Sequence, residues 1–116
     1  MGYQRHNAIV VTTWSGERAN QAHAMAVKIF GEQASPLLPE AMNGYRSFFI
    51  APDGSKEGWA ESDVGDKQRD AFVAWMTAQA YEDGSNALSW VEIAYGDDPE
   101  ASVVRSSKNP SGTGKP

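Results

Sequence analysis

The residues whose chemistry could support catalysis or metal binding are few and scattered in this 116-residue sequence. There is no cysteine, which excludes thiolate metal ligands and a cysteine nucleophile, and there are only two histidines. His6 and His23 both lack a second histidine or a carboxylate at metal-ligand spacing. Nucleophile-elbow, zinc-protease and dinucleotide-binding motifs are also absent. We therefore expect a protein that is not an enzyme and that uses no metal or other cofactor.

Two short motifs resemble ligand-binding loops but are incomplete. Residues 53–58 place oxygen donors at positions one, three and five and a glycine at position six, as calcium loops do. The twelfth position, however, is Val64 where a bidentate glutamate is needed. Residues 112–115 match the end of a phosphate-binding loop, but no strand-type segment precedes them and no helical segment follows. General acid–base catalysis by some pair of the 15 carboxylates remains an alternative, but the sequence assigns no residue a catalytic role.

Negative charge dominates the chain. The net charge is −5, and residues 102–116 contribute Arg105, Lys108 and Lys115 without any acid, so residues 1–101 carry −8. A surface this acidic repels the phosphate backbone of nucleic acids, which makes nucleic acid a disfavoured partner. A basic protein surface would be attracted instead.

Acidic residues gather where the expected turn leads into the second expected helix. They are Glu57, Glu61, Asp63, Asp66 and Asp70. One interpretation is an ordinary solvated helix face. The other is a docking surface for a basic protein, or a set of carboxylates that imitates phosphates.

Strand and helix patterns alternate along the chain. They predict a strand at residues 8–14, a helix at 17–30, a strand at 45–51, a short strand at 56–61, a helix from Asp63 to about residue 80, and a strand at 88–95. A strong turn signal at residues 52–55 makes residues 48–59 a predicted hairpin, and residues 32–44 a long connection. This order predicts an α+β, ferredoxin-like βαββαβ fold with a four-stranded antiparallel sheet and two helices on one face. If residues 56–61 form no strand, a three-stranded sheet is the alternative.

The length allows one domain, which we place at residues 1–101, followed by a flexible polar tail at residues 102–116. A hydrophobic content of 41% is sufficient for a packed core. No apolar run approaches the roughly 20 residues that cross a bilayer. The first residues lack the apolar region of a signal peptide, so the cytoplasm is the expected compartment.

The predicted sheet has one face without helices. If Val91 and Ile93 point toward the helices, the residues between and beside them point away. An uncovered apolar face of this kind usually marks an interface, most simply between two copies of the chain. The predicted interface residues are Trp90, Glu92, Trp59 and Phe48. The other interpretation is that Trp90 packs beneath residues 32–44 or beneath the tail.

Several stretches of the sequence resemble small accessory proteins encoded by bacteriophages. They are HNAIVVTTW (residues 6–14), YRSFFIAPDGSK (45–56), YEDGS (81–85) and WVE (90–92). The likeness covers most of residues 6–98 and includes no catalytic motif. The resemblance implies a protein that acts by binding, for instance by blocking a host defence complex, in the cytoplasm of an infected bacterium.

We therefore predict a non-catalytic binding protein that forms homo-oligomers and contacts no membrane. It would inhibit or adapt a host protein complex through the open sheet face or the acidic residues. The alternative is a protein that sequesters a small ligand or signalling nucleotide in a pocket at a subunit interface. In that case Arg46 or Arg69 would bind the phosphate.

Overall fold

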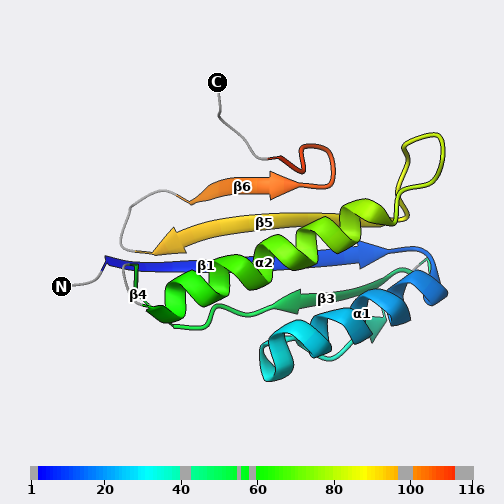
Figure 1. The fold of residues 1–116 in the computed structure, drawn as a ribbon. Coiled ribbons are helices and arrows are strands. Elements are labelled where there is room, and N and C mark those ends of the chain that lie inside the picture. The colour runs from blue at the N-terminus through cyan, green and yellow to red at the C-terminus, as the bar shows by residue number, and fades with distance from the viewer. Residues whose placement is uncertain (1–2, 40–42, 55, 58–59, 97–100, 112–116) are drawn as a thin grey trace.

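Two helices and an antiparallel sheet make up the fold, seen in a computed structural model that describes residues 3–39, 43–54, 56–57, 60–96 and 101–111 (Figure 1). The elements in chain order are β1 (Tyr3–Thr13), α1 (Gly16–Phe30), the 3₁₀ turn η1 (Gly31–Gln33), β2 (Leu38–Pro39), β3 (Arg46–Ile50), β4 (Lys56–Glu57), α2 (Ala60–Ala78), β5 (Leu88–Gly96) and β6 (Ser102–Ser106). The predicted mixture of helices and antiparallel strands is therefore confirmed.

The sheet has the strand order β2-β3-β1-β5-β6, and β4 pairs with the first residues of β1. All of the strand pairs are antiparallel. The central strand is β1, the most β-branched run in the sequence, and it pairs with β5 from Arg5 to Thr13. In this register Val10 lies between Phe49 of β3 and Val91 of β5.

The predicted hairpin at residues 48–59 is wrong. β3 pairs with β1 on one side and with β2 on the other, so it has no free edge for residues 56–61. Lys56 and Glu57 instead pair with the first residues of β1, beyond the end of β3, and the chain is helical from Ala60 onward. The partner of β3 is Leu38–Pro39, inside the stretch expected to be a connection. The strand count and order therefore differ from the predicted four-stranded sheet.

The sheet also continues into the segment predicted to be a flexible tail. β6 pairs with β5, with a register shift between Glu92 and Ile93. The chain then turns tightly, and the backbone N–H of Ser107 donates to the carbonyl oxygen of Trp90. Residues 102–107 thus complete one edge of the sheet.

Helix α1 begins and ends where its sequence predicts. The hydroxyl of Ser15 accepts the backbone N–H of Arg18, and Gly31 ends the helix with a positive φ of 63°. Its alanines Ala19, Ala22 and Ala26 are fully buried, so no larger side chain holds the helix away from the neighbouring elements.

The core lies between the sheet and both helices, around the fully buried ring of Phe72 on α2. This ring lies edge-on to Phe30 of α1 at 5.7 Å, and 6.4 Å from both Phe48 of β3 and Trp75 of α2. Because residues of α1, α2 and three strands meet in one cluster, both helices cover the same face of the sheet, as Figure 1 shows.

Replacing Phe72 with alanine is expected to lower the free energy of unfolding by about 3–5 kcal/mol, because the lost ring leaves a cavity between both helices and the sheet. Val27→Ala is the control, since this side chain on α1 is 45% exposed. The control should shift stability by about 0.5 kcal/mol or less. Chemical denaturation followed by circular dichroism measures both, and equal losses would contradict the central place of Phe72.

Candidate functional site

The two faces of the sheet are set by which side chains of β5 point toward the helices. Leu88, Trp90, Glu92 and Ala94 are buried on the helix side, and Val91 and Ile93 between them are only partly buried. This orientation is the reverse of the one expected from the sequence. Both sets of side chains in the strand include large apolar residues, so the alternation alone does not determine which set faces the core.

Three of the four predicted interface residues can be placed. Trp90 and Phe48 belong to the core cluster and are only 4% and 2% exposed. Glu92 is buried beside them on the helix side. Trp59 lies outside the residues that the structure describes. None of the three placed residues is therefore available on an open face.

The opposite side of the sheet, which we call the outer face, is formed by the other set of strand residues. Its members are His6, Ala8, Val10 and Thr12 of β1, Leu38 of β2, Ser47 and Phe49 of β3, Ser89, Val91, Ile93 and Tyr95 of β5, and Val103 and Ser106 of β6. Five large side chains in this set are more than one-third exposed, namely Val10, Leu38, Phe49, Tyr95 and Val103 at 39%, 55%, 43%, 37% and 44%. The outer face is therefore an exposed apolar surface.

Charge is distributed between the two faces in an unusual way. Among the strand residues whose side chains are described, the charged ones are Arg46, Glu92 and Arg105, and all three belong to the helix side. An antiparallel sheet with one solvated face normally directs its polar and charged residues outward. Here the outer face has only hydroxyl groups and His6 as polar members, in a chain of net charge −5.

The connection at residues 32–44 and the tail at residues 102–116 were the two segments expected as covers for Trp90. Several of their described residues lie on the helix side of the sheet. Ala34 and Leu37 of the connection pack against the core cluster. Pro110 borders small hollows with α2 residues, including Thr77. Within the described stretches 32–39, 43–44 and 101–111, the strand registers place Leu38 of β2 and Val103 and Ser106 of β6 on the outer face.

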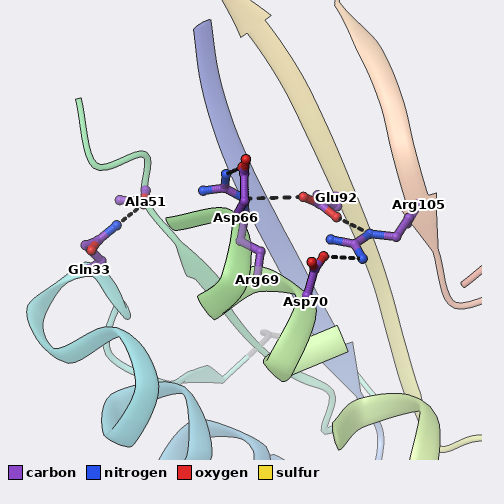
Figure 2. A network of polar contacts seen from close by, with 7 residues as sticks. All are labelled: Gln33, Ala51, Asp66, Arg69, Asp70, Glu92 and Arg105. Atoms are coloured by element: carbon purple, nitrogen blue, oxygen red, sulfur yellow. Dashed lines mark hydrogen bonds and ion pairs between the residues drawn. The ribbon is translucent and has the colours of Figure 1, made fainter. Parts of the chain in front are cut away.

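A second polar feature lies on the helix side, where α2 passes over β5 and β6 (Figure 2). The Nε of Arg105 donates to Glu92 Oε1 at 2.6 Å, and the Nε of Arg69 lies 3.5 Å from Glu92 Oε2. Arg69 also pairs with Asp66, and Arg105 Nη1 donates to Asp70 Oδ1 at 2.9 Å. These five residues, which we call the Glu92 network, connect α2, β5 and β6.

Each arginine of the Glu92 network is paired with two carboxylates. Burial disfavours the charge of Arg105, but the hydrogen bonds and charges of Glu92 and Asp70 outweigh this and raise its pKa above the ordinary value. A cavity of about 600 Å³ beside the network is lined by both arginines and by all three carboxylates. The geometry suits a structural clamp on β6, because the carboxylate of Glu92 is already occupied by two guanidinium groups.

The residues predicted to bind a phosphate are not brought together. Arg69 belongs to the Glu92 network, whereas the guanidinium of Arg46 lies against Gly16 at the start of α1. Glu92, which Arg69 contacts, lies opposite Ile9 of β1, whereas Arg46 lies opposite Thr13, four residues or roughly 13 Å along that strand.

The predicted acidic surface is divided by the Glu92 network. Asp66 and Asp70 are paired with arginines, while Glu61 and Asp63 are exposed in the first turn of α2. The side chain of Glu57 lies outside the described part of the structure. Two of the five acids are therefore partly neutralised, which favours the solvated-face interpretation for them.

The histidines have structural contacts. His23 Nε2 is hydrogen-bonded to the carbonyl oxygen of Ser35 at 2.9 Å, and the ring of His6 lies 5.2 Å from that of Tyr95. Within the described ranges, no three His, Cys, Asp or Glu residues are grouped so that they could hold a metal ion. No helix in those ranges combines the length and apolar character needed to span a bilayer.

Comparison of the chain with protein-family models, with curated proteins and with solved structures gives no match. The interpretation of its surfaces therefore depends on their geometry and chemistry.

Replacing Glu92 with glutamine is expected to lower the free energy of unfolding by about 1.5–3 kcal/mol, because Arg69 and Arg105 lose their shared buried carboxylate and keep only Asp66 and Asp70. Glu61→Gln is the matched control, since Glu61 is exposed on α2, and it should change stability by less than about 1 kcal/mol. Thermal or chemical unfolding of both variants provides the measurement. A Glu92 variant as stable as its control would show that the Glu92 network does not clamp β6.

Proposed function

We propose that this chain is a non-catalytic binding protein that docks a folded protein against its outer face. The partner that fits is a protein with a flat, apolar and uncharged surface of its own. The observation that supports this most is the reversed distribution of charge, since the described charged strand residues belong to the helix side, and the outer face has apolar residues, hydroxyl groups and His6. Exposed contiguous apolar surfaces of this kind are typical of interaction sites.

The physical chemistry of this face selects its partner. Burying apolar surface is favourable by roughly 25 cal/mol per Å², whereas a charge buried against this face would lose its hydration without gaining a counter-charge. Nucleic acids and anionic lipid surfaces are also disfavoured, because no lysine or arginine occurs among the outer-face side chains that the structure describes. Of these three kinds of partner, a protein surface is the one that the outer face favours.

The acidic residues give weaker support to a docking function than the outer face does. Asp66 and Asp70 already have arginine partners, so a basic protein would have to compete with Arg69 and Arg105 for them. The non-catalytic part of the proposal agrees with the Glu92 network, in which the buried carboxylate is held by two arginines.

We also propose that the sheet follows the ferredoxin-like plan, with strands assigned differently from the sequence prediction. In a βαββαβ sheet the first strand lies between the third and fourth, and the third lies between the first and second. The order β2-β3-β1-β5 agrees with this when α1 connects β1 to β2 and α2 connects β3 to β5. β6 then adds a strand at the β5 edge.

In the setting that the sequence resemblance implies, the docked protein is a component of a bacterial host that is inhibited or adapted by the contact. The phage resemblance itself stays a prediction, since the comparisons give no match. The small-ligand alternative has less support, because the charge of Arg69 is already compensated by Glu92 and Asp66.

A photo-crosslinking amino acid at position 49, on the outer face, is expected to give protein adducts in a bacterial host. The same residue at position 27, an equally exposed site on α1, should give none above background. The adduct is identified by mass spectrometry, and the identified protein is then purified for binding measurements. Val10→Lys should weaken that binding by about tenfold or more, because the lysine ammonium would be buried without a partner.

Two results would refute the proposed function. One is a position-49 variant that gives no more adduct than the position-27 control. The other is a purified partner whose affinity is unchanged by Val10→Lys, which would show that the contact does not use the outer face.

A further inference from the structure

We infer that, when no other protein is bound, the outer face docks a second copy of this chain, in a two-fold symmetric dimer with sheet packed against sheet. This inference rests on the proposed function, because the second copy and the host protein would use the same apolar surface.

The outer face is arranged in rows that a two-fold axis can superimpose. One central row runs across the strands through Phe49, Val10 and Val91, and the next runs through Ala8, Ile93 and Val103. The row beyond the first contains only the hydroxyl groups of Ser47, Thr12 and Ser89 together with Leu38, and the row beyond the second contains His6 and Tyr95. Among the described side chains, the apolar rows are therefore central, with polar groups at both ends.

Such an arrangement is complementary to itself. A two-fold axis between two facing sheets runs either along the strands or across them. In both cases the central apolar rows of one copy meet the central apolar rows of the other. Aligned sheets pack in this way about 10 Å apart, with strands inclined by roughly 30°.

Electrostatics favours association through this face over any other. Two chains of net charge −5 repel each other, and exposed acids are prominent on α2. Since α2 covers the opposite face of the sheet, a dimer joined by the outer faces holds its two α2 helices on its far sides (Figure 1). Those helices would be roughly 30 Å apart, several times the Debye length of about 8 Å at physiological ionic strength.

The size of the face sets the expected strength of the dimer. Five strands spaced about 4.8 Å apart span about 19 Å, and the six-residue distance from His6 to Thr12 spans about 20 Å. The face therefore offers roughly 400 Å² per copy, about half of the area in a standard stable interface. A reversible dimer whose population rises with protein concentration is the expected result.

Sedimentation velocity of the purified full chain over a wide range of concentration tests the inference. The wild-type chain should shift from monomer to dimer as concentration increases. Val10→Lys should stay monomeric over the same range, whereas Val27→Lys, a charge placed on an equally exposed valine of α1, should behave like the wild type. Circular dichroism establishes that each variant is folded, and Phe49→Lys replaces Val10→Lys if the latter is not.

The absence of cysteine provides a second, independent measurement. A single Val10→Cys substitution should give covalent dimers with a short bismaleimide, and Val27→Cys should give none. Crosslinking at both positions to the same extent would indicate random collision and would overturn the inference.

The outcomes separate the inference from the proposed function. Two results overturn the second copy as the partner. One is a chain that is monomeric at every concentration, and the other is a dimer that survives the folded outer-face variant, Val10→Lys or Phe49→Lys. If position 49 still forms an adduct with a different protein, and Val10→Lys weakens binding to it, the proposed function stands without the dimer. If position 49 gives no adduct at all, both fail.

Discussion

The position of β1 at the centre of the sheet, with apolar side chains on both of its sides, is the constraint on which the rest of the structure depends. Ile9 and Val11 are fully buried beneath the helices, while Val10 between them is 39% exposed on the other side. A strand paired on both edges and apolar on both faces needs two covers. The helices supply one cover, and the exposure of Val10 among the described residues is the reason we propose docking on the outer face.

The Glu92 network links this constraint to the end of the chain. β5 can turn its glutamate toward the helices only because Arg69 from α2 and Arg105 from β6 meet the carboxylate there. The orientation of β5 and the attachment of β6 are therefore coupled through one buried ion cluster. That coupling also keeps the one acid of β5 off the outer face.

The sequence predicts the regular elements well where local signals are strong. The helix predicted at residues 17–30 is α1 (Gly16–Phe30), and the strand predicted at 88–95 is β5 (Leu88–Gly96). The orientation of β5 was not predictable, because Trp90 and Val91 are both apolar and a burial pattern of period two fits either side. The predicted hairpin was wrong because the edge of β3 that does not pair with β1 pairs with β2, a two-residue strand that no local sequence pattern reveals.

The same two-residue strand controls how the sheet can grow. β2 ends the sheet at the β3 side and contains Pro39, which has no backbone N–H to offer an incoming strand. The missing donor and the short length of β2 disfavour strand addition at this edge. The inferred dimer would bury the apolar outer face in a closed assembly, while the β2 edge gives fibril growth a poor template.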